Sequence, residues 1–450
     1  MKPSKSFVKK EQKKTYNWLI IACFMLSMLL LSFIKTSFCP APSSPDNEDK
    51  DTAGATKPLC DTTGRRSSTC DVEGDVRIHG SSGTIVFSAA GDDQQQQQQW
   101  KIKPYARKHD PVASANIKEW SLKPFAGAGA GGLPNCTKTH DVPAVVFSIG
   151  GFTGNFFHDF TDILVPLFTT ARQFDGDVQF IVSDVKSWWI GKFKLILGRL
   201  SKRELIDAGD EEGRDAVHCF RRVIIGPMFH KELGIDSAKS PKGYSIADFR
   251  TLLRDSFGLR RKTVAEIDAE RPGQRPRLLI ISRKRSRAFV NAHGMEEMAR
   301  SIGYDVVSAE PGMATDIAKF ARLVNSADVM VGVHGAGLTN MVFLPDKAVV
   351  IQVIPLGGLE YLARDSFKEP ALEMDLHYLE YVLREDESTL SDVYPKDHPV
   401  IKDPMSVHKK GWDALKEVYL DKQNVKPHLG RLREKFMEAL KLLQQQQQHD

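Results

Sequence analysis

Residues 329–340 read VMVGVHGAGLTN. A short apolar run typical of a buried strand leads directly into His334, Gly335, Ala336 and Gly337, after which residues typical of a helix resume. Glycines in such a turn let a ligand approach the backbone, and free amide groups at a helix start attract anions such as a diphosphate. Small residues also permit close helix packing, so the turn alone is weak evidence for a site.

The same alternation of apolar strands and amphipathic helices extends to both sides of this turn. Buried strands joined by helical crossovers form parallel sheets covered on both faces, so we predict an α/β fold with two such sheets. A charged segment with prolines at residues 260–275 is interpreted as the linker between two halves. Ligands are then expected at the carboxyl ends of the strands. The predicted strands are residues 144–148, 178–183, 222–226, 277–282, 305–309, 329–333 and 349–354, and the predicted helices include residues 245–257, 295–302 and 316–325.

A basic loop, SRKRSR at residues 282–287, follows one of the predicted strands. Arginine forks bind phosphate oxygens in pairs and lysine adds a point charge, so this loop could neutralise a nucleotide diphosphate without a metal. The alternative is a solvated basic loop. The position at the carboxyl end of a strand favours phosphate binding.

A third segment, GGFTGNFFHDFTD at residues 150–162, places a glycine loop before a helix. His158 and Asp162 are four residues apart and share one helical face, so the carboxylate can orient the imidazole as a general base requires. Asp159 is expected on another side of the helix. An ordinary charged helix is the alternative, and a position facing the phosphate loops favours a site.

Together these segments resemble the plant members of glycosyltransferase family 61, which include grass xylan arabinosyltransferases and xylosyltransferases. The resemblance covers about residues 60–420 and is strongest in DVPAVVFSIGGFTGNFFHDFTD from Asp141, LLIISRKRSRAFVN from Leu278 and DVMVGVHGAGLTNMVFLP from Asp328. It implies a GT-B architecture, in which two Rossmann-like domains face a cleft, and inverting transfer from a UDP sugar. More distant members, which transfer N-acetylglucosamine to proteins, share the spacing of His158, Phe160 and Asp162.

The resemblance also implies which side of the cleft each segment occupies. His158 and Asp162 are the expected catalytic residues. The donor-binding candidates are Arg283, Lys284, Arg287, Glu310, His334, Gly335, Ala336, Gly337 and Thr339, of which Glu310 would hold a ribose hydroxyl. The acceptor-side loop contributes Gly151, Thr153, Gly154, Asn155 and Asp159.

The expected chemistry is attack of an acceptor hydroxyl, deprotonated by His158, on the anomeric carbon while the basic loop stabilises the departing diphosphate. Because there is no DxD sequence in a suitable loop, we expect no metal and no tightly bound cofactor beyond the UDP sugar substrate. A noncatalytic glycan-binding scaffold is a competing class. A dehydrogenase is disfavoured because HGAG does not supply a GxGxxG turn. The sequence leaves the pentose, xylose or arabinose, and the acceptor open, with a xylan-type polysaccharide implied by the resemblance.

The first residues predict the topology. Six lysines precede an uninterrupted apolar run at residues 18–34. That run is at the short end of the ~17 to 25 residues that span a bilayer, and basic residues before it place the N-terminus in the cytosol. A cleaved signal peptide is the alternative, but bulky residues leave no good cleavage site. We therefore expect a single-pass type II protein of the Golgi membrane with a lumenal catalytic region, in complexes with other Golgi glycosyltransferases.

Cysteines and composition agree with a lumenal globular protein. Cys23 lies inside the apolar run and Cys39 at its exit, which leaves four cysteines in the expected lumenal region; of their three possible connectivities we favour Cys60 with Cys70 and Cys136 with Cys219. Asn135 begins the sequon Asn-Cys-Thr, a glycosylation site if lumenal. A net charge of +5 over 450 residues gives no support for nucleic-acid binding. The predicted regions are a cytosolic tail at 1–17, an anchor at 18–34, a stem at 35–57, an acceptor-side domain at 58–262, a nucleotide-sugar-binding domain at 276–408, and C-terminal helices with a polyglutamine tail at 409–450.

Overall fold

The computed structural model describes residues 58–88, 98–125, 135–210, 216–266 and 275–446. These residues belong to one compact unit. The predicted cytosolic tail, anchor and stem, residues 1–57, lie outside them. Among the helices of the described ranges, none has the length and apolar character needed to cross a membrane.

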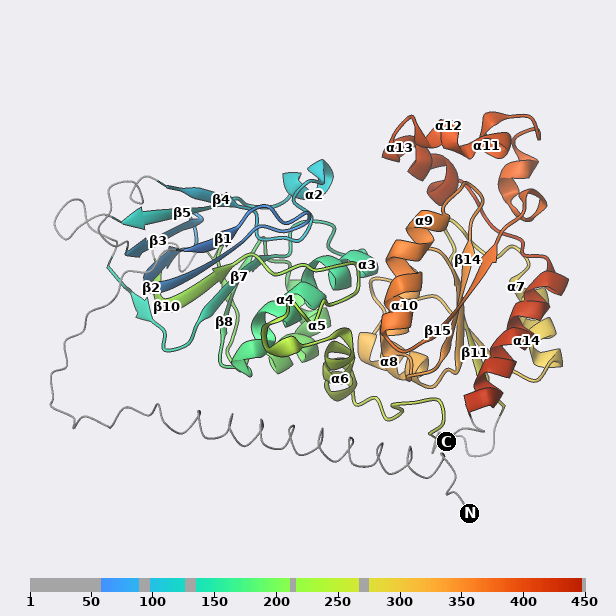
Figure 1. The fold of residues 1–450 in the computed structure, drawn as a ribbon, viewed down its shortest axis with the longest axis horizontal. Helices are drawn as coiled ribbons and strands as arrows, with labels where there is room; N and C mark the ends of the chain where they lie inside the picture. Colours follow the sequence, from blue (N-terminus) through green and yellow to red (C-terminus); the bar gives the residue numbers. More distant parts are fainter. Residues whose placement is uncertain (1–57, 89–97, 126–134, 211–215, 267–274, 447–450) are drawn as a thin grey trace, which may run out of the picture. The chain divides into compact units, whose positions relative to one another are not determined.

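The first half of the chain forms a mixed sheet of ten strands within the described residues (Figure 1). Its order is β4-β5-β3-β2-β10-β7-β8-β9, with β1 beside β2 and β6 beside β10. The bounds are β1 Leu59–Asp61, β2 Thr69–His79, β3 Thr84–Ser88, β4 Trp100–Ile102, β5 Trp120–Phe125, β6 Lys138–Thr139, β7 Ala144–Ser148, β8 Gln179–Ser183, β9 Ile206–Asp207 and β10 Val217–Ile225.

The prediction of a purely parallel sheet is wrong for this half. Strands β10, β7, β8 and β9 are parallel, but β10 pairs antiparallel with β2, and β2 pairs antiparallel with β3. The reason lies in burial: β7 and β8 are buried at every residue, whereas most of β2 alternates between more and less buried positions. An alternating strand suits the antiparallel part of a sheet.

Helices cover the parallel part of the first sheet. They are α2 Pro111–Ala115, α3 Phe156–His158, the π-helix η2 Asp159–Leu164, α4 Val165–Ala171, the 3₁₀ helix η3 Arg172–Phe174, α5 Ser187–Leu200, η4 Pro241–Gly243 and α6 Ile246–Phe257. Helix α6 confirms the prediction at 245–257: Ser245 and Asp248 form a capping box at its start, and Gly258 ends it with φ 62°.

The second half contains a five-stranded sheet in the order β12-β11-β13-β14-β15, parallel throughout. Its strands are β11 Arg277–Ile281, β12 Asp305–Ala309, β13 Val329–Val333, β14 Val349–Ile354 and β15 His377–Val382. The first four confirm the predicted strands, and β15 was not predicted. Leu278 and Ile280 enter one hydrophobic cluster while Leu279 and Ile281 enter another, so both faces of this sheet are buried.

The helices of the second half complete these two faces. They are α7 Ala292–Ser301, α8 Ile317–Asn325, η5 Ala336–Phe343, α9 Glu360–Ala363, η6 Arg364–Lys368, α10 Glu369–Glu373, η7 Glu385–Glu387, η8 Thr389–Asp392, α11 Pro399–Lys402, α12 Pro404–His408, α13 Trp412–Leu415, η9 Lys416–Asp421 and α14 Leu429–Gln446. Helices α9 and α10 lie on one face of the sheet and α14 on the other (Figure 1).

The C-terminal helix α14 is more than a tail. Its Leu432, Phe436, Ala439 and Leu443 lie in the same hydrophobic cluster as the strand residues of one sheet face. The helix continues through Gln446, so the polyglutamine run that we interpreted as tail is partly helical.

A shared core joins the two halves. Phe160 of η2 packs edge to face against Phe343 of η5, with ring centroids 5.9 Å apart. The buried guanidinium of Arg250, on α6, donates to Asp346 at 2.5 Å and to the carbonyl of Val342 at 3.4 Å. Residues of the loop before α3 and of the loop after β11 line one cavity.

Candidate active site

Residues of both halves line a cavity of about 620 Å³. Small-molecule sites commonly have ~300 to 1,000 Å³, and this one lies where the parallel strands β11, β12 and β13 end, as expected for an open sheet. The predicted site residues that line it are Gly154, Asn155, Arg283, Lys284, Glu310, Ala336 and Gly337. The predicted residues outside its lining are Gly151, Thr153, His158, Asp159, Asp162, Arg287, His334, Gly335 and Thr339.

Two arginines converge on the turn after β13. A Cβ atom added to Gly335 would lie 2.7 Å from Nη1 of Arg287 and 3.0 Å from Nη1 of Arg283. Gly335 also has φ 139°, which other residues rarely adopt. Glycine is therefore needed at this position, because any side chain would displace the guanidinium groups.

The acidic groups that act on the two arginines do so without a salt bridge among the described residues: Glu310 and Asp421 act on Arg283, and Asp421 acts on Arg287. Burial lowers the pKa of Arg283, and burial together with the charge of Arg283 lowers the pKa of Arg287 to about 9. Within the described ranges neither forms a salt bridge; Arg283 donates to the carbonyl of Ser286 at 3.0 Å and Arg287 to that of His334 at 2.7 Å. Two partly buried like charges of this kind favour a bound polyanion.

Glu310, another predicted donor contact, already binds a neighbouring residue. Glu310 lines the cavity, but its carboxylate accepts from the backbone N–H of Lys284 at 2.8 Å and lies 3.1 Å from the ammonium of the same residue. A ribose hydroxyl would have to share this carboxylate with Lys284. Asn340, which the sequence analysis missed, also lines the cavity.

His334 acts as a support. Burial, followed by the charges of Arg287 and Arg283, lowers its pKa to about 3, so the ring is neutral. Its Nδ1 lies 2.8 Å from the amide nitrogen of Gln352, and its ring packs edge-on against Phe367. His334, which we predicted to bind the donor, therefore supports Arg287: its backbone carbonyl accepts a hydrogen bond from that arginine.

The helix expected after the HGAG turn is a 3₁₀ helix, η5. Thr339 lies inside it, fully buried, and its hydroxyl has no hydrogen-bond partner among the described residues. Its side chain does not line the cavity, so a direct contact with a donor has no support from its position.

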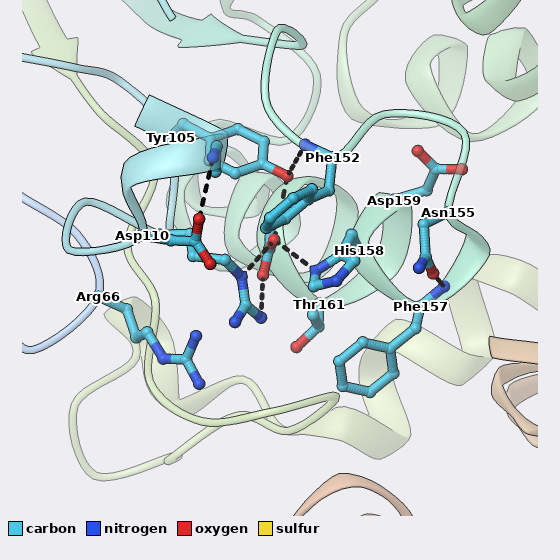
Figure 2. A network of polar contacts seen from close by, with 12 residues as sticks. Arg66, Tyr105, Asp110, Phe152, Asn155, Phe157, His158, Asp159 and Thr161 are labelled. Atoms are coloured by element: carbon cyan, nitrogen blue, oxygen red, sulfur yellow. Dashed lines mark hydrogen bonds and ion pairs between the residues drawn. The ribbon is translucent and has the colours of Figure 1, made fainter. Parts of the chain in front are cut away.

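His158 and Asp162 contact each other as the i, i+4 spacing predicted. Nδ1 of His158 lies 2.9 Å from Oδ2 of Asp162 (Figure 2). Asn155 caps the short helix α3 by accepting from the N–H of Phe157 at 3.1 Å, and the chain then widens into the π-helix η2. Because Asp162 occupies Nδ1, Nε2 is the ring nitrogen left for a substrate.

Two residues that the sequence analysis missed complete this network. Arg107 donates to Asp162 through Nε at 2.8 Å and Nη2 at 2.9 Å, and the hydroxyl of Tyr105 donates to it at 3.0 Å. Burial raises the pKa of Asp162, but the hydrogen bonds from His158 and Arg107 outweigh it and hold that pKa below its usual value. Asp162 is therefore an ionised, fully buried anchor.

Asp159 and the glycine loop have structural contacts. Asp159 is buried and accepts from the N–H of Gly154 at 3.0 Å and from the indole of Trp189 at 2.9 Å. Burial raises its pKa. A Cβ on Gly151 would lie 2.4 Å from the ring of Tyr105, so this glycine makes room for the tyrosine, and Thr153 donates to the carbonyl of Ile149.

The disulfides and the glycosylation sequon predicted from the sequence lie within the described residues. The structure has disulfides between Cys60 and Cys70 and between Cys136 and Cys219, the pairs that the sequence favoured. Asn135 of the sequon is exposed. In the part of the chain that is described, no three His, Cys, Asp or Glu side chains gather as metal ligands, and independence from metals stays a prediction.

Comparisons with known proteins match this chain to one family of glycosyltransferases. A family model described as Glycosyltransferase 61 matches residues 155–351. The chain is 47% identical over 384 residues to the alpha-1,3-arabinosyltransferase XAT3 of Oryza sativa subsp. japonica, covering 85% of this chain and 65% of that protein. It is 39% identical to the beta-1,2-xylosyltransferase XYXT1 of the same organism, covering 85% and 84%, and 37% identical to the xylan glycosyltransferase MUCI21 of Arabidopsis thaliana, covering 84% and 78%. The chain thus spans less than two thirds of the length of the arabinosyltransferase.

Proposed function

Because the chain belongs to the glycosyltransferase 61 family, we propose that it is a pentosyltransferase that transfers xylose or arabinose from a UDP sugar to a xylan-type polysaccharide. The names of the plant relatives support this donor and acceptor class. We further propose that the two sheets form a GT-B cleft and that the enzyme resides in the Golgi membrane with its catalytic region in the lumen.

The observation that carries the proposal is the arginine pair at Gly335. Arg283, which lines the cavity, and Arg287, which lies outside its lining, bring two guanidinium groups, free of salt bridges among the described residues, to a turn whose Ala336 and Gly337 line the cavity. A UDP sugar places two adjacent phosphates that such a pair would bind through charge-assisted hydrogen bonds. The same positive field would stabilise UDP as it leaves, which lowers the barrier to transfer.

The proposed reaction is a single displacement. The proton of an acceptor hydroxyl passes to Nε2 of His158 while its oxygen forms a bond to the anomeric carbon. The bond between that carbon and the β-phosphate oxygen breaks, and UDP departs with the electron pair on its diphosphate, so the configuration inverts. Asp162, fixed by Arg107 and Tyr105, holds the imidazole in the tautomer and orientation that a base needs.

His158 is close to the cavity without lining it. Its side chain is 17% exposed, and the neighbouring residues Asn155 and Phe156 line the cavity. An acceptor seated against these two residues would bring its hydroxyl toward the imidazole, so we assign the base to His158.

A donor screen tests the proposal. The purified full chain is incubated with UDP-xylose, UDP-arabinofuranose, UDP-arabinopyranose or UDP-N-acetylglucosamine together with xylo-oligosaccharides, and the products are weighed by mass spectrometry. We expect a mass increase of one pentose with one of the pentose donors. Tight UDP binding without transfer to any acceptor would instead indicate a scaffold, and transfer of N-acetylglucosamine alone would contradict the pentose.

A further inference from the structure

One face of α5 carries a tryptophan beside the cavity. Trp188, Lys192 and Leu195 are four and seven residues apart on this helix, so they share a face. Lys192 lines the cavity, and Trp188 is one helical turn before it with 42% of its surface exposed. The adjacent Trp189 is fully buried, so the two neighbouring indoles have different roles.

Contacts with the glycine loop place Trp188 at the cavity rim. A Cβ on Gly154, which lines the cavity, would lie 3.4 Å from Cη2 of Trp188 and 3.9 Å from Cε of Met313. Met313 follows β12 in the second half and is 65% exposed. An indole and a thioether from different halves therefore flank the same backbone position.

Buried hydrogen bonds fix this arrangement. Asp159 accepts from the N–H of Gly154 and from the indole of Trp189 through one oxygen, so it ties the glycine loop to the first turn of α5. The exposed indole of Trp188 is consequently held on a rigid element. A rigid aromatic face binds a ligand with little loss of conformational entropy.

The chemistry of this rim suits a sugar ring. Pyranose rings present C–H groups on their faces and hydroxyls around their edges, so they stack on an indole while hydroxyls bind neighbouring polar groups. Asn155 and Lys192 supply such groups along the cavity wall. An acceptor polysaccharide is longer than the cavity, and its sugars beyond the reacting one must lie on the surface next to it.

We infer that Trp188, with Met313 beside it, is an acceptor subsite on which a sugar ring of the polysaccharide stacks next to the reacting residue. This inference rests on the proposed function, and it deepens it by assigning the acceptor path to the rim between Gly154 and α5. Longer acceptors would then bind more tightly than a single sugar, because only they reach both the reacting position and the indole.

The test compares Trp188→Ala with Trp412→Ala in the full chain. Trp412 lies on α13 and is 55% exposed, and no residue of α13 lines the cavity, whereas α5 contributes Lys192 to it, so Trp412 is a matched control. Binding of xylohexaose in the presence of UDP is measured by calorimetry, and the KM for xylohexaose is measured in the transfer assay. We expect Trp188→Ala to weaken binding and raise KM about tenfold, the change that 1.4 kcal/mol produces, with kcat and UDP affinity unchanged.

Further variants and readouts separate the possible outcomes. Trp188→Phe keeps an aromatic face and should recover most of the lost affinity. Wild-type xylohexaose affinity in Trp188→Ala, or an equal loss in Trp412→Ala, would overturn the subsite. Absence of transfer in the wild-type chain would count against the proposed function, while the calorimetric comparison would still decide whether Trp188 binds a glycan.

Discussion

Arg107 donates two hydrogen bonds to the carboxylate of Asp162, from Nε to Oδ2 at 2.8 Å and from Nη2 to Oδ1 at 2.9 Å. The same Oδ2 faces Nδ1 of His158 at 2.9 Å. The carboxylate therefore joins the largely buried Arg107 to the proposed base, so a substitution of the arginine should alter the orientation of the imidazole.

Asp162→Asn should destabilise the protein by about 3 kcal/mol, because it removes the carboxylate that binds the largely buried Arg107 through two hydrogen bonds and leaves only Glu232, at 3.5 Å, as its acidic neighbour. The folded-state pKa of Asp162 lies below its ordinary value of 3.8, so its contribution is present above that pH and is lost as pH falls through the folded value. Urea unfolding of wild type and variant at pH 7 and near pH 3 measures this. The difference between them should shrink at the lower pH, and a constant difference would contradict the assignment.

His158→Ala should lose transfer by ~10² to 10⁴ in rate while keeping its UDP affinity, because the general base acts in the transition state. Rapid-quench assays give the transfer rate and calorimetry gives the UDP affinity. His293→Ala, a change on the exposed surface of α7, is the control. Transfer at the wild-type rate in His158→Ala would place the base elsewhere.

Some segments of the fold could be predicted from the sequence and others could not. Strands β11 to β14 were predictable because continuous apolar runs end in turns. Strands β2 to β5 lie before the clear alternation of strands and helices and were missed. Tyr105 and Arg107 could not be found because they lie 57 and 55 positions before Asp162, and no local pattern marks the fold that brings them together.

The i, i+4 contact of His158 and Asp162 was predictable from helical periodicity, even though the helix widens into a π-helix at this point. For Arg283, Arg287 and Gly335, the sequence predicted only that all three lie at the carboxyl ends of strands in one sheet. It did not predict that the two guanidinium groups meet at Gly335. The sequence could not tell a side chain that lines the cavity from one that supports it, as His334 does, because that depends on packing against Gln352 and Phe367.

Gly335→Ala should weaken UDP binding at least as much as removal of one arginine. The new methyl group would lie 2.7 Å from Nη1 of Arg287, and φ 139° is strained for alanine. Gly312→Ala, where an added Cβ meets no atom within 4 Å, is the control on the same cavity. Unchanged UDP affinity in Gly335→Ala would mean that the guanidinium groups do not bind the ligand.

Asn135 should carry an N-linked glycan if the catalytic region is lumenal, because its side chain is exposed and begins a sequon. Endoglycosidase treatment of the full chain expressed in plant or yeast cells should lower its apparent mass, and Asn135→Gln should abolish the shift. An unchanged mass, with protease digestion of the catalytic region from the cytosolic side of intact vesicles, would contradict the Golgi topology.

The UDP affinity of Arg283→Ala and Arg287→Ala, measured by calorimetry against wild type, tests whether the arginine pair forms the nucleotide-sugar site. Each variant removes one of the two guanidinium groups that meet at Gly335. We predict a loss of about 1.5 to 3 kcal/mol in each, the range for hydrogen bonds to charged groups, with no loss in Arg300→Ala on the outer surface of α7. Wild-type UDP affinity in both arginine variants would contradict a nucleotide-sugar site at this turn.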